Sequence, residues 1–393
     1  MSVMRTALAL AATVLSLLVT GPAFAEDETG LSGRLQDTLD AFQERYDLPG
    51  ATAAIVLPDG TVATVATGLA DVEAGRAMTP GTPMLAASIG KTFVAATVLS
   101  LESEGALAQD DLLAEHLGDR AWFADLPNAR SITIGHLLHH QSGLPDHPHL
   151  TAFQDAAAAR IASGGHAFTP EELLGFVTER EALFGAGTGW AYSDSGYIVL
   201  GLLIEEVTGQ RYYDVVAGRF LAPVDLTDTI PSDRPDLPGL AVGYTIPDNP
   251  FGLPVRTADA HGVLVWDPGV EWTGGGFAST SANLARWGHA LFGGEAMETP
   301  YLDRLLDGVS VTPDASGILY GAGVAIYAYT PLGPVYGHGG WIPGYVSSLR
   351  HYADHGITVA FQINSDAGVV DDSSDHVAKM EAALARLAME GLE

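Results

Sequence analysis

The most informative short motif is Ser88-Ile89-Gly90-Lys91, at the predicted start of a helix that runs to about Glu104. Residues three positions apart on a helix share a face, so the hydroxyl and the amine are predicted to lie within hydrogen-bonding reach. A serine hydroxyl becomes a good nucleophile when a base accepts its proton, and a lysine in a suitable environment can be that base. Backbone N–H groups at the helix start would stabilise developing negative charge. The motif therefore predicts acyl-transfer chemistry at Ser88.

Lysine is rare in this chain, which makes the motif more informative. The sequence has 18 basic and 48 acidic side chains, and lysine occurs only at Lys91 and Lys379. Arginine, which fills the other basic positions, stays protonated and cannot serve as a base. Lysine is therefore retained at a position where its chemistry differs from that of arginine. Lys379 falls on the predicted last helix and carries no such implication.

Two further segments contain residues with catalytic potential. Tyr192-Ser193-Asp194 lies in a turn-rich loop before an apolar helix, and His338-Gly339-Gly340-Trp341 lies at the edge of the C-terminal strands. Each candidate also has a purely structural interpretation. These interpretations are a helix N-cap for Ser88, a packed aromatic for Tyr192, a loop histidine for His338 and an Asx turn for Asp194.

Together these motifs resemble those of the serine penicillin-recognising hydrolases. The pattern of that family is S-x-x-K, then Y-x-N or Y-S-x, then K-T-G or H-x-G, in this order and at about these separations. The most similar branch contains the class C β-lactamases, the secreted D-alanyl-D-alanine carboxypeptidases and β-lactamase-fold esterases. Segments 134–138, 142–144 and 274–280 also resemble this family, and the resemblance extends from about Leu31 to Leu387.

The resemblance implies a role for each motif residue. Ser88 would be the acylated nucleophile and Lys91 the residue that activates it. Tyr192 would relay a proton between nucleophile and leaving group, with its phenolate form favoured by nearby cations. His338 would be the basic residue of the third motif, next to that tyrosine. The backbone N–H groups of Ser88 and Trp341 would form the oxyanion hole.

The expected substrate-binding residues are Asp194, Gly339 and Gly340, and two of them depart from the family pattern. Asp194 stands where many members have asparagine, and an ionised carboxylate can only accept hydrogen bonds, so it is expected to pair with Lys91. Gly339 replaces a hydroxyl residue that helps to hold the carboxylate of penicillins or of a C-terminal D-Ala. Both departures argue against efficient β-lactam hydrolysis, and His338 in place of lysine favours the carboxypeptidase and esterase members.

The composition excludes several classes of protein. A net charge of -30 without a basic stripe argues against nucleic-acid binding. A content of 47% hydrophobic and 17% charged residues is typical of a globular chain rather than a disordered one. The sequence contains no cysteine, so no disulfide stabilises the fold. Neither a cofactor nor a metal site is expected.

Residues 1–25 have the pattern of a signal peptide. Arg5 is followed by an apolar run over Ala7–Val19, and Ala23-Phe24-Ala25 matches an A-x-A cleavage site. The run is too short for a comfortable membrane span, and no similar stretch follows. We therefore expect an exported protein, periplasmic or secreted, without a stable membrane anchor; a retained N-terminal anchor is the alternative.

The order of expected elements predicts an α/β fold of the α+β type. An antiparallel sheet would be flanked by N- and C-terminal helices, with an all-α region inserted in the middle. Residues 26–393 would form one hydrolase domain, with its sheet region at about 31–105 and 270–393 and the insertion at about 106–269. The resemblance implies the β-lactamase/transpeptidase-like fold.

Two other kinds of site are weaker predictions. Ser88, Asp194 and His338 follow the chain order of an α/β-hydrolase triad, but that fold needs a buried strand just before the serine, and the sequence before Ser88 contains Pro80, Gly81 and Pro83. His136 and His140 have the spacing of a helical metal pair, but the acidic residue of the zincin arrangement is missing.

The sequence therefore predicts a serine hydrolase that forms an acyl-enzyme at Ser88. Its expected substrates are small molecules or peptides, namely D-Ala-D-Ala peptides or carboxylic esters. A class C-like β-lactamase and a non-catalytic module that binds muropeptides or β-lactams are the alternatives.

Overall fold

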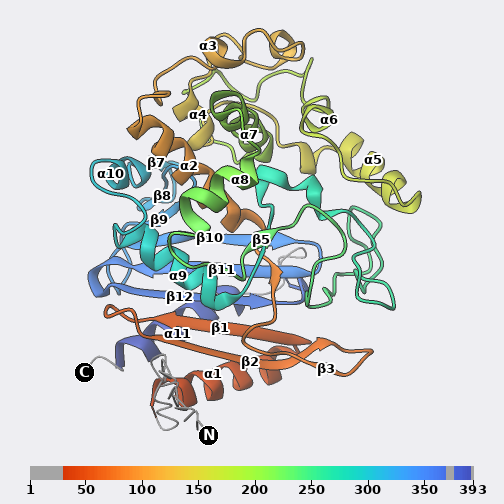
Figure 1. The fold of residues 1–393 in the computed structure, drawn as a ribbon, viewed down its shortest axis with the longest axis vertical. Helices are drawn as coiled ribbons and strands as arrows, with labels where there is room; N and C mark the ends of the chain where they lie inside the picture. The colour runs from red at the N-terminus through yellow and green to blue at the C-terminus, as the bar shows by residue number, and fades with distance from the viewer. Residues whose placement is uncertain (1–29, 369–375, 391–393) are drawn as a thin grey trace, which may run out of the picture.

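The computed structural model describes residues 30–368 and 376–390 (Figure 1). The predicted signal peptide, residues 1–25, lies outside the described residues. Within the described part of the chain, no helix is both long enough and apolar enough to cross a membrane.

A nine-stranded antiparallel sheet forms the centre of the molecule, in the order β3-β2-β1-β12-β11-β10-β9-β8-β7. Its strands are β1 (Gly50–Val56), β2 (Val62–Asp71), β3 (Arg76–Ala77), β7 (Val309–Ser310), β8 (Ile318–Tyr320), β9 (Ala325–Tyr327), β10 (Val335–Ile342), β11 (Tyr345–Tyr352) and β12 (Ile357–Ile363). The two ends of the chain meet where β1 pairs with β12, which places Ala54 opposite Ala360. The predicted antiparallel sheet, built from both ends of the chain, is confirmed.

The β1–β2 hairpin forms at the turn signal Pro58-Asp59-Gly60. The carboxylate of Asp59 accepts a hydrogen bond from the N–H of Thr61 at 2.9 Å, and Gly60 has a φ of 83° that favours glycine. Strand β1 is buried along its whole length, because helices cover both faces of the sheet. This burial explains why its sequence is a continuous apolar run rather than an alternating one.

The terminal helices α1 (Leu31–Tyr46) and α11 (His376–Glu390) cover one face of the sheet (Figure 1). Leu35 and Leu39 of α1 and Met380 and Leu384 of α11 are fully buried in one cluster with residues of β1 and β12. These residues repeat at helical spacing, so the apolar stripe in the sequence corresponds to the buried face. The predicted flanking helices are confirmed.

Helix α9 (Ser281–Phe292) covers the opposite face and joins the sheet to the helical region. Its Trp287 is fully buried and stacks on Phe93 with ring centroids 4.2 Å apart. The indole N–H of Trp287 also donates to the hydroxyl of Thr92 at 2.8 Å. Phe93 and Thr92 follow Lys91 directly, so this packing fixes the helix that begins at Lys91.

The helical region lies above the sheet in Figure 1. Its helices are α2 (Lys91–Ser103), α3 (Leu113–Leu117), α4 (Ile134–Leu138), α5 (Thr151–Ala162), α6 (Pro170–Leu174), α7 (Asp194–Thr208), α8 (Tyr212–Val216) and α10 (Tyr301–Leu305). A small sheet of β4 (Met84–Leu85), β6 (Phe277–Ser279) and β5 (Ile230–Pro231) lies beside it. The exact domain boundaries at 105 and 270 stay a prediction.

Candidate active site

Ser88 lies in a short 3-10 helix, η1 (Ala87–Gly90), directly before α2. Ala87 has a φ of 48°, in the left-handed region that residues with a side chain rarely adopt. The N–H of Ala86 donates to the carbonyl oxygen of Phe277 at 2.8 Å, and the hydroxyl of Ser347 donates to the carbonyl oxygen of Ala86 at 2.7 Å. Neighbouring segments therefore hold the strained turn in place, as is common where a fold fixes a functional residue.

The turn does not follow a strand of the central sheet, because the residues before it form the two-residue strand β4 of the small sheet. The α/β-hydrolase alternative is therefore wrong. The N-cap interpretation of Ser88 also fails, since no side chain caps η1 or α2.

A run of glycines lets a second backbone segment approach η1. A Cβ added to Gly90 would lie 1.8 Å from the carbonyl oxygen of Gly275, so no side chain fits there. The same approach brings the carbonyl oxygen of Gly274 into contact with the Nζ of Lys91. In segment 274–280, which resembles the family, the glycines thus allow the backbone to contact η1 and Lys91.

Lys91 is fully buried and contacts the nucleophile directly. Its Nζ lies 3.0 Å from the Oγ of Ser88 and 2.5 Å from Oδ1 of Asp194, and it also contacts the carbonyl oxygen of Gly274. The predicted contact between Ser88 and Lys91 is confirmed. The amine thus lies within reach of the hydroxyl proton of Ser88, while Gly274 and Asp194 hold it in place.

Asp194 is the first residue of α7, and its carboxylate contacts Lys91. Ser193 caps the helix, since its hydroxyl accepts the N–H of Gly196 at 3.3 Å, while the N–H of Asp194 donates to Oδ1 of Asp146 at 2.8 Å. The Asp194 carboxylate is thus not needed to cap the helix. Its expected pairing with Lys91 is confirmed.

Tyr192 has its ring beside Lys91, with Nζ 4.9 Å from the ring centroid. Burial of the hydroxyl, followed by the negative charge of Asp194, raises the pKa of Tyr192 well above its usual value. The nearby hydroxyl of Ser88 lowers the pKa of Tyr192 but offsets only part of this effect. The expectation that nearby cations favour the phenolate is therefore wrong, because desolvation dominates. Tyr192 is a neutral group that can donate its proton.

His338 lies within β10 and is buried. Its Nε2 is 2.8 Å from the hydroxyl of Tyr320, and its ring centroid is 6.1 Å from that of Tyr192. Burial, with the charge of Lys91 as the next cause, lowers the pKa of His338 to about 3. The expectation of a basic group next to Tyr192 is thus wrong about its charge: His338 is neutral and is hydrogen-bonded to Tyr320.

Strand β10 passes beside η1, which brings Gly340 and Trp341 close to the nucleophile. After Gly337, β10 pairs with no described residue on the edge that faces β9. A Cβ on Gly340 would lie 2.2 Å from the carbonyl oxygen of Ala86, so glycine is required there. At Gly339 an added Cβ would meet nothing closer than 3.8 Å, so a hydroxyl residue would fit and its absence is not forced by space.

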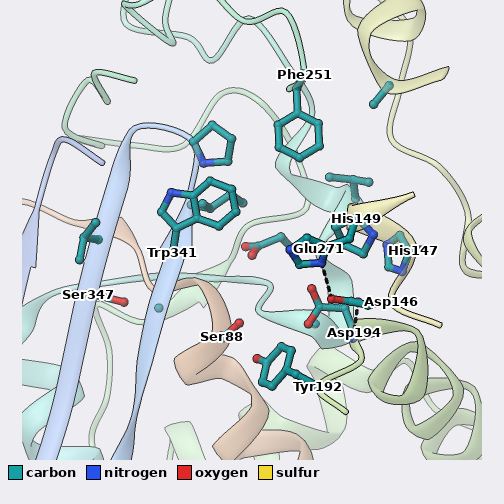
Figure 2. A pocket seen from close by; sticks show the side chains of 18 of the residues that line it. Ser88, Asp146, His147, His149, Tyr192, Asp194, Phe251, Glu271, Trp341 and Ser347 are labelled. Carbon is teal, nitrogen blue, oxygen red and sulfur yellow. Dashed lines mark hydrogen bonds and ion pairs between the residues drawn. The ribbon is translucent and has the colours of Figure 1, made fainter. Parts of the chain in front are cut away.

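A cavity of about 700 Å³ opens above Ser88. Figure 2 shows Ser88 and Tyr192 on one side, Phe251 on the opposite side and Trp341 beside them. The cavity is also lined by apolar side chains, namely Phe153, Phe168, Leu253, Trp266 and Val270. The predicted site residues Ser88, Tyr192, Asp194, His338, Gly339, Gly340 and Trp341 line it together. The arrangement therefore places a serine and its lysine partner under a pocket that suits an apolar group.

His136 and His140 do not face a common point as a metal pair would. His136 accepts the N–H of Thr133 through Nδ1 at 3.2 Å, and His140 accepts the N–H of Ser193 through Nδ1 at 3.1 Å. Among residues 30–368 and 376–390, no group of three or more potential ligands could hold a metal ion.

The comparison with protein families agrees with this geometry. A model of the Beta-lactamase family matches residues 35–384. The chain belongs to the Beta-lactamase family. Relatives in this family include D-aminopeptidases and a D-stereospecific amidohydrolase, which supports a serine hydrolase over the non-catalytic alternative.

Similar family members include cell-wall and D-amino-acid enzymes. The chain is 26% identical to penicillin-binding protein 4* of Bacillus subtilis over 71% of its length, and 27% identical to a D-aminopeptidase of Cereibacter sphaeroides over 85%. It spans only 60% of the length of each of these relatives. A D-stereospecific amidohydrolase from Streptomyces sp. has a similar structure, with a TM-score of 0.73, 27% identity and coverage of 85% of this chain and 94% of that one.

Sequence reasoning missed several residues of this Beta-lactamase-family site. Tyr320 contacts His338, Asp146 holds the start of α7, and Glu271 lies in the pocket wall. Burial raises the pKa of Glu271 to about 8, and Asp194 acts in the same direction while Lys91 opposes it. None of these residues lies in a motif, so only their positions in the fold identify them.

The raised pKa of Glu271 predicts a pH dependence of stability. The folded chain keeps this carboxyl protonated up to about pH 8, whereas its ordinary value is 4.5. The folded state therefore binds more protons between these values, and the free energy of unfolding falls as the pH rises through this window. We expect Glu271→Gln to raise Tm more at pH 9 than at pH 5, measured by thermal unfolding. An equal shift at both values would contradict this prediction.

Proposed function

We propose that Ser88 forms an acyl-enzyme and that Lys91 accepts its proton. The observation that carries this proposal is the 3.0 Å contact between Nζ of Lys91 and Oγ of Ser88 at the floor of a cavity of about 700 Å³. The carbonyl oxygen of Gly274 and the carboxylate of Asp194 also contact this amine. Ser88 itself is partly exposed, so a substrate in the pocket can reach its hydroxyl.

The proposed reaction is amide or ester hydrolysis in two stages. Oγ of Ser88 attacks the carbonyl carbon as its proton passes to Lys91, and the backbone N–H groups of Ser88 and Trp341 stabilise the oxyanion. The C–N or C–O bond then breaks as the leaving group takes a proton, with Tyr192 as the donor and Lys91 as the source that reprotonates it. In the second stage water attacks the ester of Ser88 by the same route and releases the acid.

The substrates that fit best are amides, short peptides and esters with an apolar acyl residue. Phe153, Phe251 and Val270 offer such a residue an apolar surface in the pocket that Ser88 lines. The relatives named D-aminopeptidase and D-stereospecific amidohydrolase support a preference for the D configuration. We therefore favour amide and peptide bonds after an apolar D-residue, within the peptide and ester class predicted from the sequence.

A carboxypeptidase or β-lactamase specificity is less well supported, because the two arginines that line the pocket form ion pairs within the protein. Arg350 pairs with Glu381 at 3.1 Å, and Arg160 pairs with Glu172 at 3.1 Å. His338 is neutral, and Gly339 offers no hydroxyl. A substrate carboxylate would therefore compete with these glutamates for the two arginines of the pocket.

A parallel kinetic screen tests this proposal. The substrates are D- and L-phenylalanine p-nitroanilide, a p-nitrophenyl ester, nitrocefin and a D-Ala-D-Ala peptide. We expect the highest kcat/KM among the amides and peptides for the D-anilide, with at least a tenfold preference over its L enantiomer. Faster cleavage of nitrocefin or of the D-Ala-D-Ala peptide than of the D-anilide would contradict the proposed specificity.

Asp194→Asn is expected to shift the specificity towards β-lactams. The substitution removes the carboxylate from Lys91 and adds an amide donor that can bind a substrate carbonyl. An added hydrogen bond of this kind predicts roughly a tenfold gain in kcat/KM for nitrocefin. Steady-state kinetics with nitrocefin and the D-anilide measure the change. Asp155→Asn, on α5, is a matched control for the loss of one carboxylate, and a proportional change with both substrates would contradict the prediction.

We also propose that the chain is exported by cleavage after Ala25. This proposal rests on the sequence of residues 1–25 alone. N-terminal sequencing of the protein recovered outside the cytoplasm is expected to begin at Glu26, and an uncleaved N-terminus in that fraction would contradict it.

A further inference from the structure

We infer that Glu271 binds the free ammonium group of the substrate's acyl residue. The inference rests on the proposed function, because it assumes that the acyl residue occupies the pocket above Ser88. An enzyme with such a site would act after a free N-terminal residue rather than on an N-blocked or neutral acyl group.

Two short turns fix the backbone of Glu271. The residue lies between the 3-10 helices η5 (Pro268–Val270) and η6 (Trp272–Gly274). Its N–H donates to the carbonyl oxygen of Pro268 at 3.1 Å, and its carbonyl oxygen accepts the N–H of Gly274 at 2.6 Å. The side chain therefore starts from a rigid point. Figure 2 shows its carboxylate extending into the pocket, between Trp341 and Asp194.

The glycine run places the carboxylate next to the nucleophile turn. A Cβ added to Gly275 would lie 2.6 Å from Oε1 of Glu271 and 2.7 Å from the carbonyl carbon of Ala87, the residue before Ser88. Both atoms thus lie within 3 Å of one point. In an amino acid the α-nitrogen is only about 2.5 Å from the carbonyl carbon, given standard bond lengths and angles. Since Ser88 and Glu271 line the same pocket, an amine beside a carbonyl under attack by Ser88 can reach the carboxyl of Glu271.

One oxygen of the Glu271 carboxyl has no partner in the described part of the chain. This oxygen, Oε2, is enclosed by the protein. The nearest cation, Lys91, is already engaged by Ser88, Gly274 and Asp194. Ionising an enclosed carboxyl without a donor is costly, so the free enzyme keeps Glu271 protonated, and a cationic ligand with several N–H donors would stabilise its ionised form.

The other carboxylates of the pocket are already used. Asp194 pairs with Lys91, and Asp146 accepts the N–H of Asp194 and contacts Nδ1 of His149 at 2.8 Å. Asp267, which also lines the pocket, accepts the N–H groups of Ala167 and Gly269 at 3.0 Å each. Asp194 and Asp146 remain close enough to make this end of the pocket negative, which favours a cation. Glu271 is the acidic lining residue that is left to bind it.

The test measures protection of Ser88 by an amine, independently of turnover. Benzylamine and benzyl alcohol are matched in shape but only the amine is cationic. Each is titrated against the rate at which a neutral fluorophosphonate labels Ser88, in the native enzyme and in Glu271→Gln. We expect benzylamine to protect the native enzyme at a concentration at least tenfold lower than benzyl alcohol, and this difference to disappear in Glu271→Gln.

Equal protection by the two compounds in the native enzyme would overturn the inference, as would an amine preference that survives in Glu271→Gln. Glu115→Gln, an exposed residue of α3, is the matched control and should keep the preference. Labelling of Ser88 itself shows that each variant has a folded site. If the D-anilide is not cleaved but the amine preference depends on Glu271, the proposed substrate is wrong and the amine site stands.

Turnover separates binding from chemistry. Glu271→Gln is expected to raise KM for the D-anilide by about 10- to 100-fold, as for a lost hydrogen bond to a charged group, and to raise KM for p-nitrophenyl butyrate, which has no ammonium group, by much less. An equal fall in kcat for both substrates would mean that Glu271 transfers protons in the reaction, which would overturn its assignment as an ammonium site.

Discussion

Replacing Lys91 with methionine is expected to lower kcat by about 10³-fold, within the range typical of a lost general base. Methionine is similar in length and apolar, so it occupies the buried space without accepting the proton of Ser88. Lys91→Arg is expected to be equally inactive although it keeps the positive charge, because arginine does not give up its proton. Steady-state kinetics on a p-nitrophenyl ester measure both variants.

The controls separate lost chemistry from lost stability. Lys91 pairs with Asp194 at 2.5 Å, and breaking a buried ion pair can cost about 3–5 kcal/mol. The double variant Lys91→Met/Asp194→Asn removes both charges, so its Tm should recover while its activity stays low. Lys379→Met, at the other lysine of the chain, should leave the activity unchanged. Activity in Lys91→Arg close to that of the native enzyme would contradict the role of Lys91 as a base.

Ser88→Ala is expected to remove covalent catalysis altogether, with a loss in kcat on the order of 10⁵ to 10⁶ by analogy with serine hydrolases whose nucleophile is deleted. The change removes one oxygen atom from a partly exposed residue, so Tm should change little. Because Ser88 and Lys91 act as one unit, the double variant Ser88→Ala/Lys91→Met should be no less active than Ser88→Ala alone. Kinetics and thermal unfolding on the same samples measure both properties.

Residual hydrolysis in Ser88→Ala needs a matched control, because trace contamination can imitate it. Ser103→Ala, at the last position of α2 and away from the pocket, passes through the same purification and should keep full activity. Turnover in Ser88→Ala within tenfold of that control would contradict Ser88 as the nucleophile.

The fold could be predicted largely from local patterns. The stripes of α1 and α11 repeat at helical spacing, and Asp59-Gly60 marks the hairpin of β1 and β2. The contact between Ser88 and Lys91 follows from three-residue spacing, although the 3-10 turn η1 was not visible in the sequence. These features depend on residues close together in the chain.

The electrostatics of the site could not be predicted in this way. His338 is neutral and Tyr192 protonated because burial outweighs nearby charges, and burial depends on residues far away in the sequence. Tyr320 and Glu271 belong to no motif and reach the site only because strands and turns fold around Ser88. Motifs thus identified the reacting atoms, whereas the structure identified the groups that surround them.

The most direct measurement traps the acyl-enzyme during turnover. The native enzyme is mixed with p-nitrophenyl butyrate, quenched in acid within the first turnovers and digested for mass spectrometry. The account predicts a butyryl group on the peptide that contains Ser88, at the serine itself, and about 10³-fold slower formation of this adduct in Lys91→Met. A butyryl group on another residue, or adduct formation at an unchanged rate in Lys91→Met, would contradict it.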